Sequence, residues 1–185
     1  ALNYDVNANI DDSSCIYSQT LNISLGWSLI STYILPDDLD ISILFSPLVD
    51  QIVLIKNNVG TAYLPEWNFN GIGDMVAGQG YQIKLNSDQQ LTISGDLLLP
   101  ELTPIDLTLG WNLIGYLRQF PADVTAVFQE MLSNGSLVIV KDSEGNAYLP
   151  EWSFNGIGYM VSGNAYQIKT NEAYSLIYLS NDQDY

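Results

Sequence analysis

The chain has 185 residues, 47% of them hydrophobic, and it carries a formal net charge of −16 without a single histidine. Enough apolar residues are present to build a core, so intrinsic disorder is not expected. The negative charge argues against nucleic-acid partners, and no apolar run is long enough for membrane insertion. Without histidine, Ser-His-Asp catalysis, Cys-His catalysis and histidine-based zinc sites are excluded for this chain.

Residues 1–19 are rich in Asp and Asn and contain the only cysteine, Cys15. Asp5, Asn7, Asp11 and Asp12 carry oxygen atoms of the hard type that calcium prefers, so one interpretation is a small calcium-binding loop. The spacing does not match an EF-hand. The alternative is a polar linker in which Asn and Asp side chains form turns.

Each half of the remaining chain begins with an alternating apolar segment, at residues 21–29 and 105–113. A period of two predicts a half-buried strand. Gly26 and Gly110 interrupt the pattern and indicate a bulge or a close backbone approach. Trp27 and Trp111 lie on the apolar side of the alternation, so we expect both rings in the core.

A short helix is predicted after each of these strands. Asp40 and Asp123 are the expected N-caps, and apolar residues then recur at the i, i+3 and i+4 spacings of one helical face. Pro47 should end or kink the first helix near Ser46. The second helix should continue to about Ser133, before the stop signal Asn-Gly at residues 134–135.

A hairpin follows each helix, and one motif organises the chain from this point because it occurs twice. Residues 63–73 read Tyr-Leu-Pro-Glu-Trp-Asn-Phe-Asn-Gly-Ile-Gly, and residues 148–158 differ from them only by Ser153 in place of Asn68. The similarity extends over residues 56–84 and 141–169, which indicates an internal duplication. The hairpin strands are predicted at 52–55 with 61–64 and at 137–140 with 146–149, and two more strands close each copy.

We therefore predict an α+β fold that is mostly antiparallel β, with two tandem homologous lobes, each containing one short helix, packed as one pseudo-symmetric body. Residues 20–95 and 105–180 form the lobes, 96–104 form an apolar linker, and 181–185 form a tail. Residues 1–19 are a truncated repeat or a linker. Exposing Leu97, Leu98 and Leu99 together would be costly, so we expect the linker to be buried between the lobes.

The duplicated segment resembles a repeat module of secreted and surface proteins of marine Bacteroidetes, which also occurs in marine viruses. The resemblance rests on Gly-Trp at 26–27 and 110–111, Ala-Tyr-Leu-Pro at 62–65 and 147–150, and Tyr-Gln-Ile-Lys at 81–84 and 166–169. The N-terminus resembles a second repeat of such proteins, Cys-Thr-Asp…Asn-Tyr…Asp-Asp-Gly-Ser-Cys, with Ser13 in place of the usual Gly.

These resemblances imply a fragment of a longer extracellular, cell-surface or virion-surface protein, with a cysteine upstream that could pair with Cys15. They also imply a non-catalytic structural or interaction module, as a component of adhesion or of a fibre. Its partners would then be a glycan or protein at a surface, or neighbouring domains or subunits of the fibre.

The candidate ligand-binding residues form two corresponding sets: Tyr63, Glu66, Trp67 and Asn70, then Tyr148, Glu151, Trp152 and Asn155. Aromatic faces beside amides and carboxylates suit weak glycan binding, so a carbohydrate-binding module is the alternative function. In the competing interpretation the Trp rings cover the lobe cores and the Asn side chains hold turns. An exposed, coplanar pair of aromatic rings would favour glycan binding, and buried Trp rings would favour a structural role.

Two further interpretations concern charged residues. Glu66 and Glu151 have the chemistry of paired glycosidase carboxylates, but they occupy equivalent places in separate copies, so we expect no enzyme. The lysines recur in the two pairs Lys56/Lys141 and Lys84/Lys169. This recurrence predicts a fixed structural partner, with Glu66 and Glu151 as the expected acids, against the alternative of edge-strand protection.

Overall fold

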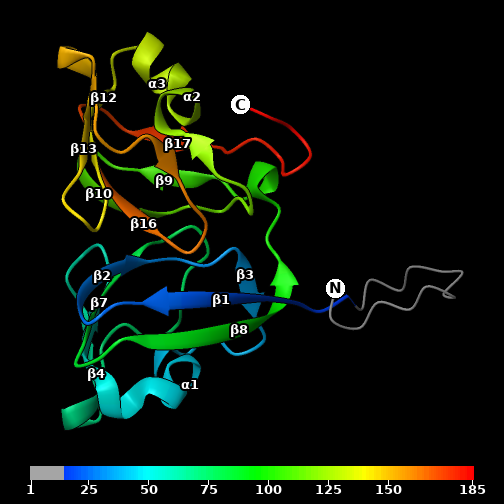
Figure 1. The fold of residues 1–185 in the computed structure, drawn as a ribbon, viewed down its shortest axis with the longest axis vertical. Coiled ribbons are helices and arrows are strands. Elements are labelled where there is room, and N and C mark those ends of the chain that lie inside the picture. Colours follow the sequence, from blue (N-terminus) through cyan, green and yellow to red (C-terminus); the bar gives the residue numbers. More distant parts are fainter. Residues whose placement is uncertain (1–14) are drawn as a thin grey trace, which may run out of the picture.

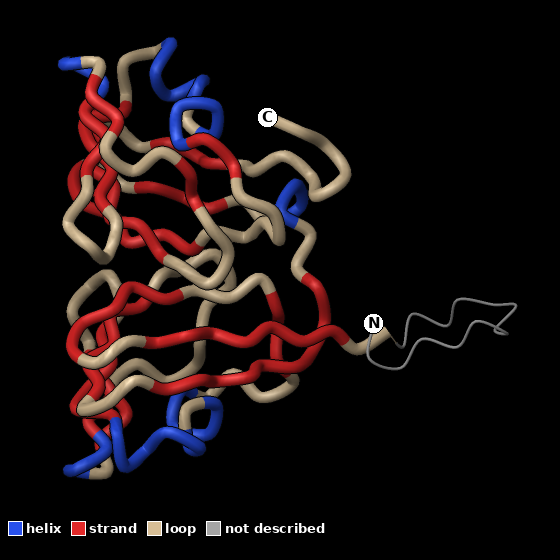
Figure 2. Tube along the Cα trace, viewed as in Figure 1, coloured by secondary structure: helices blue, strands red, loops and turns tan. Residues whose placement is uncertain are grey.

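A computed structural model describes residues 15–185, and the candidate calcium ligands Asp5, Asn7, Asp11 and Asp12 lie outside the described residues. The fold consists mostly of antiparallel β-sheet with a few short helices, which confirms the predicted α+β class. Most helices lie at two opposite ends of the molecule, and the region between them contains the strands and one short 3-10 turn at Pro100–Leu102 (Figures 1 and 2). No helix in residues 15–185 combines the length and the hydropathy that crossing a membrane requires.

The N-terminal half, residues 15–97, contains a five-stranded sheet in the order β2-β7-β4-β5-β6 and a three-stranded sheet in the order β1-β8-β3. Its elements are β1 (Tyr17–Ile23), β2 (Gly26–Ile30), β3 (Ile34–Pro36), α1 (Ile41–Leu44), the 3-10 helix η1 (Ser46–Gln51), β4 (Ile52–Lys56), β5 (Ala62–Leu64), η2 (Pro65–Trp67), β6 (Phe69–Asn70), β7 (Tyr81–Leu85) and β8 (Gln89–Leu97).

The C-terminal half, residues 98–185, contains a five-stranded sheet in the order β10-β16-β12-β13-β14 and the two-stranded sheets β11-β15 and β17-β9. Its elements are η3 (Pro100–Leu102), β9 (Ile105–Leu107), β10 (Gly110–Gly115), β11 (Ala122–Asp123), α2 (Val124–Val127), α3 (Gln129–Ser133), β12 (Leu137–Lys141), β13 (Ala147–Leu149), η4 (Pro150–Trp152), β14 (Phe154–Asn155), β15 (Tyr159–Met160), β16 (Ala165–Thr170) and β17 (Tyr174–Leu176).

The first predicted strand of each half is in fact two strands, and this overturns the expected burial of Trp27 and Trp111. Gly26 and Gly110 have positive φ angles of 87° and 98°, where β1 gives way to β2 and β9 gives way to β10. The chain leaves one sheet for another at this point, and the side-chain alternation changes face. The odd-numbered positions of β1 are buried from Gln19 onward, whereas Trp27 is 49% exposed and Trp111 is 48% exposed.

The helices begin where the sequence predicts. The Asp40 side chain accepts hydrogen bonds from the Ser42 and Ile43 amides, and the Asp123 side chain accepts one from the Thr125 amide. The first helix ends at Leu44, and a 3-10 turn containing Pro47 follows, as expected from the missing N–H of proline. The second predicted helix is divided into α2 and α3 at Phe128, which has φ −100° and ψ 18°.

Each half has its own hydrophobic core. The core of the N-terminal half includes Phe45, Ile55 and Ile83, and the core of the C-terminal half includes Phe128 and Ile168. Between Leu97 and Leu98 the chain passes from one core to the other, because Leu97 packs against the first cluster while Leu98 belongs to the second. Leu99 is exposed, so the predicted burial of the linker is correct only in part.

The two halves meet through the ends of the β2–β7 and β10–β16 pairs. Two isolated antiparallel bridges cross the junction, Ile30 with Asn164 and Gln79 with Ile114. The Ser31 amide donates to Gly163 O at 2.9 Å, and the Gly115 amide donates to Gly78 O at 2.8 Å.

Small side chains allow this close approach of the two backbones. A Cβ atom on Gly80 would lie 2.5 Å from the Cβ of Ala165, and one on Gly115 would lie 2.9 Å from the Cβ of Ser31. A larger side chain at either glycine would therefore separate the two halves.

Candidate functional site

The members of each predicted ligand-binding set differ in exposure, so neither set forms a single binding site. Tyr63 and Tyr148 are buried in the cores of their halves, so their ring faces cannot stack on a ligand. Trp67 and Trp152 are each 71% exposed, and Phe69 and Phe154 beside them are exposed as well. The interpretation that these Trp rings cover the lobe cores is therefore wrong.

Asn70 and Asn155 hold turns, in agreement with the structural interpretation of these residues. The Gly73 amide donates to Asn70 Oδ1 at 2.9 Å, and the Gly158 amide donates to Asn155 Oδ1 at 2.8 Å. Asn70 Nδ2 also donates to Asp40 Oδ1 at 3.1 Å. Hydrogen bonds, first from the Ser42 hydroxyl and also from backbone amides and Asn70, lower the pKa of Asp40.

Glu66 and Glu151 are exposed on the short turns η2 and η4. These turns lie at opposite ends of the molecule, η2 in teal at the lower left and η4 in orange at the upper left of Figure 1. A glycosidase requires its two carboxylates on either side of one glycosidic bond. Glu66 and Glu151 do not form such a pair.

A different surface gathers the remaining candidate groups, and we call it the sheet face. It consists of the side chains that point outward from the two five-stranded sheets around Trp27 and Trp111. Trp27 stands directly opposite Lys84 in the β2–β7 pair, and Trp111 stands opposite Lys169 in the β10–β16 pair. Directly opposed residues share one face of a sheet, so each tryptophan lies beside a lysine.

Three of the four lysines do have fixed partners, but the partners are aromatic rings. The Nζ atoms of Lys56 and Lys84 lie 5.5 Å and 5.8 Å from the centroid of the Trp27 ring, and Lys141 Nζ lies 5.5 Å from that of Trp111. These distances are typical of cation–π contacts. The predicted partnership with Glu66 and Glu151 is wrong, because in residues 15–185 the lysines form no ion pair with either acid, and three of the four ammonium groups lie over indoles.

Two neighbouring pockets open on the sheet face where the two halves meet. The Trp111 pocket, of about 130 Å³, is lined by Asn57, Asn58, Gln82, Trp111, Asn112, Leu113 and Gln167. The Trp27 pocket, of about 190 Å³, is lined by Trp27, Ser28, Leu29, Gln82, Asp142, Ser143 and Gln167. Each pocket combines the tryptophan strand of one half with the hairpin turn of the other half. Gln82 and Gln167 line both pockets.

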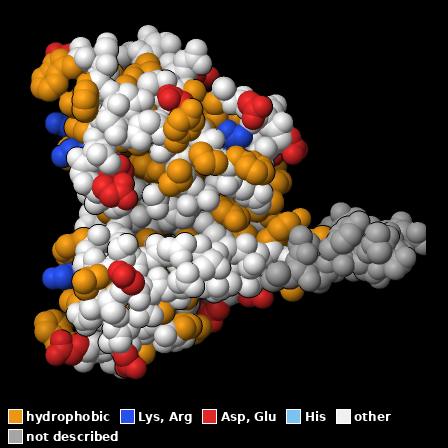
Figure 3. Space-filling model, in the orientation of Figure 1, with side chains coloured by type: hydrophobic (Ala, Val, Ile, Leu, Met, Phe, Trp, Pro, Cys, Tyr) orange, Lys and Arg blue, Asp and Glu red, His pale blue; other side chains and the backbone are white. Residues whose placement is uncertain are grey.

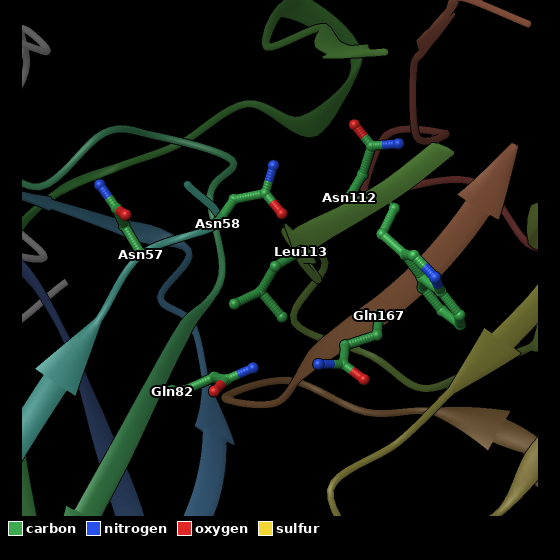
Figure 4. Close-up of a pocket in the computed structure, with 7 residues that line it drawn as sticks. Asn57, Asn58, Gln82, Asn112, Leu113 and Gln167 are labelled. Carbon is green, nitrogen blue, oxygen red and sulfur yellow. The ribbon is translucent and has the colours of Figure 1, made fainter. Parts of the chain in front are cut away.

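Figure 4 shows how the side chains that line the Trp111 pocket lie. Gln82 and Gln167 point toward one another, Leu113 lies above the space between them, and Asn58 lies on the far side of Leu113. Asn112 points away, and it is occupied by hydrogen bonds with the backbone of Thr108 at 2.9 Å and 2.8 Å. The pocket therefore presents primary amides beside an indole.

The hairpin turns that close the pockets use the same geometry with a different charge. Asn57 Oδ1 accepts hydrogen bonds from the Val59 and Thr61 amides. Asp142 Oδ1 accepts the corresponding bonds from the Glu144 and Asn146 amides. The Trp27 pocket thus contains a carboxylate at the position where the Trp111 pocket has a neutral amide.

Figure 3 shows Lys or Arg side chains in blue along the left edge of both halves, next to hydrophobic side chains in orange. The sheet face thus combines half-exposed indoles, amides and ammonium groups, which suit binding. Sequence analysis missed this face because it placed Trp27 and Trp111 in the core. The paired glycines and the paired lysines were the signals that could have indicated it.

No group of three or more side chains that could hold a metal ion occurs in the part of the chain that the structure describes. Comparison of the chain with protein-family models, with curated proteins and with solved structures finds no match.

Proposed function

We propose that this chain is a non-catalytic interaction module that binds a glycan on the sheet face, as part of a secreted or surface-exposed protein. The observation that carries the proposal is the pair of adjoining pockets, each with a half-exposed tryptophan beside the amides of Gln82 and Gln167. A sugar ring offers an apolar face for an indole and hydroxyl groups for amides. Apolar surface with a few directing polar groups is the usual composition of a small-ligand site.

The exposure of the tryptophans favours this function over a purely structural one. Trp27 and Trp111 bury only part of their rings, although a full burial of such large side chains would contribute more to stability. Exposed aromatic residues that share one face and stand beside polar groups are typical of binding surfaces. A protein partner on the same face is the second candidate.

The two halves are, in this proposal, copies of one module related by an approximate twofold axis, and they form one rigid body. Ile30 with Asn164 and Ile114 with Gln79 are the same contact made twice between corresponding residues. Gly80 meets its counterpart Ala165, and Gly115 meets its counterpart Ser31. Reciprocal contacts of this kind are the mark of a twofold interface. The axis places the two pockets side by side, which suits a ligand with repeating units.

The extracellular, cell-surface or virion-surface location and the role in adhesion or in a fibre rest on the resemblance described above. A calcium site at Asp5, Asn7, Asp11 and Asp12 is part of the same proposal. Glycan binding measured with and without calcium tests whether the N-terminal segment contributes.

The test is affinity electrophoresis in gels that contain soluble polysaccharides, with Trp27→Ala, Trp111→Ala and the double variant. We expect retardation of the unmodified chain by at least one glycan, weaker retardation of each single variant, and none of the double variant. Phe120→Ala is the control, because Phe120 is an exposed aromatic residue that lines neither pocket.

Trp67→Ala and Trp152→Ala distinguish the sheet face from the exposed turns. If these variants lose binding while Trp27→Ala and Trp111→Ala retain it, the ligand binds at the turns and the proposed site is wrong. If no polysaccharide retards the unmodified chain, the proposed function is wrong.

A further inference from the structure

The lysines of this acidic chain are concentrated on one surface. Lys56, Lys84, Lys141 and Lys169 are, with Arg118, the 5 basic residues of the sequence, against 21 Asp and Glu. All of the lysines lie in the two five-stranded sheets, and each is adjacent to Trp27 or Trp111. A random distribution over the surface would not place every lysine beside the two pockets.

Arg118 does not take part in this surface because the C-terminal tail covers it. Its side chain is buried, it donates to Gln183 O, and it lies 4.8 Å from the centroid of the Tyr185 ring. The lysines differ from it, because each remains at least partly exposed on the sheet face.

The ammonium groups on the sheet face keep their charge available for a ligand. Lys56, Lys84 and Lys141 contact indole rings, and no ion pair with a carboxylate occurs at these lysines in residues 15–185. A cation–π contact holds an ammonium in place without cancelling its charge. Among the lining residues of the two pockets, the single acid is Asp142, in the Trp27 pocket.

We infer that the glycan bound on the sheet face is a polyanion whose sugar rings carry sulfate or carboxylate groups, an inference that rests on the proposed glycan-binding function. The indoles and amides contact the rings, and the lysines on either side of the pockets contact the anionic groups. Charges beyond about 8 Å are screened at physiological ionic strength, so the local lysines outweigh the distant acidic residues.

A glycan fits this surface better than a nucleic acid or an acidic peptide. The pockets are small, at about 130 Å³ and 190 Å³, and they are lined by amides and an indole rather than by several cations. This composition matches single sugar rings with a charged substituent.

The experiment compares matched glycans that differ only in charge. A sulfated galactan is compared with its chemically desulfated form, and polygalacturonate with its methyl ester, by titration calorimetry at low and high NaCl. We expect one charged member to bind about tenfold more tightly than its neutral partner, and its affinity to fall as salt increases. The pair that responds identifies sulfate or carboxylate as the recognised group.

Variants locate the effect on the sheet face. Lys84→Gln and Lys169→Gln should each weaken binding of the charged glycan about twofold to fivefold, as expected for exposed charge pairs. Asp142→Asn should strengthen it by a similar factor. The turn should persist because Asn57 makes the same two bonds to backbone amides in the other half, and only the bond from Asn146 Nδ2 to Asp142 Oδ2 is lost. Ser94→Asp, on the exposed side of β8 in the three-stranded sheet, is the control with the same change in net charge as a lysine variant.

Each outcome separates this inference from the proposed function. Equal affinity for the neutral and charged glycans, with no effect of the lysine variants, overturns the inference and leaves glycan binding intact. A loss with Ser94→Asp as large as with Lys84→Gln overturns it as well, since only net charge would then matter. Equally tight binding of poly-glutamate would show that the site selects charge and not sugar. If none of the glycans binds, the proposed function itself fails.

Discussion

The Trp27 pocket and the Trp111 pocket are built from corresponding strands and turns, and they differ in one charge. Asp142 and Asn57 make the same two hydrogen bonds to backbone amides, so the turn requires a short side chain with an acceptor oxygen and is indifferent to its charge. The carboxylate of Asp142 adds one further turn bond, because its Oδ2 accepts a hydrogen bond from Asn146 Nδ2 at 2.8 Å. A residue that supports the fold can thus still set the electrostatics of a pocket.

The halves also differ in how they complete their cores. The N-terminal half uses the strand β3 and the nine-residue strand β8 in a three-stranded sheet. The C-terminal half has only β9 and β17 at the corresponding place, and it adds an edge-to-face contact of Tyr116 and Tyr178 at 5.4 Å. The Tyr178 hydroxyl donates to Gly115 O at 2.9 Å. Aromatic packing thus replaces part of a sheet.

The largest effect on stability is expected from substituting the matched core residues Ile83 and Ile168, which are both fully buried. Ile83→Ala and Ile168→Ala should each lower the free energy of unfolding by about 2–5 kcal/mol. If the halves form one cooperative unit, each variant shifts a single transition in chemical denaturation followed by circular dichroism and by tryptophan fluorescence. Val59→Ala, at a highly exposed position, is the control. Two separate transitions would show that the halves unfold independently.

A substitution at the junction of the two halves should change the stability by an intermediate amount. Gly80→Ala should destabilise the protein by about 1–3 kcal/mol, because the added methyl group overpacks the contact with Ala165. Ala165→Gly in the same chain should recover part of the loss, because it removes the opposing methyl group. The double-mutant cycle measures this coupling by thermal unfolding. Additive effects of the two substitutions would contradict the close approach at this position.

At alkaline pH the C-terminal half should become less stable, because the Tyr174 hydroxyl loses its proton. Burial, together with the hydrogen bond to Glu130 at 2.8 Å, raises the pKa of Tyr174 from 10.0 to about 12. The folded state holds this proton more tightly than the unfolded state, so the stabilisation is complete below pH 10 and is lost as the pH rises toward 12. In an ultraviolet titration, Tyr174→Phe should remove a component near pH 12, and Glu130→Gln should move it to lower pH.

The smallest effect concerns the one difference between the repeated motifs. Asn68 and Ser153 both have positive φ angles, 48° and 49°. Asn tolerates this left-handed region better than Ser. Ser153→Asn should raise, and Asn68→Ser should lower, the free energy of unfolding by about 0.5 kcal/mol or less. If thermal unfolding shows changes in the free energy of unfolding with the opposite signs, contacts of these side chains outweigh the backbone preference.

Much of the fold follows from local sequence signals. The duplication, the capping residues Asp40 and Asp123 and the break at Pro47 depend on neighbours along the chain, and the sequence shows these directly. The burial of Trp27 was predicted wrongly, because alternation cannot reveal that a strand leaves one sheet for another at Gly26. The lysine partners were predicted wrongly for a related reason, since Lys84 and Trp27 become neighbours only through strand pairing. The pockets depend on both halves, so neither repeat predicts them alone.

The reciprocal bridges of Ile30 with Asn164 and of Gln79 with Ile114 have a consequence for how such a site can change over evolutionary time. In a dimer of identical subunits, one substitution alters both binding pockets at once. Here both partners of the contact belong to one gene product, so Asp142 can replace the amide of one pocket while Asn57 preserves the other. In the proposed function, where the two halves are fused copies of one module, each pocket is free to acquire its own preference while the shared contact is retained.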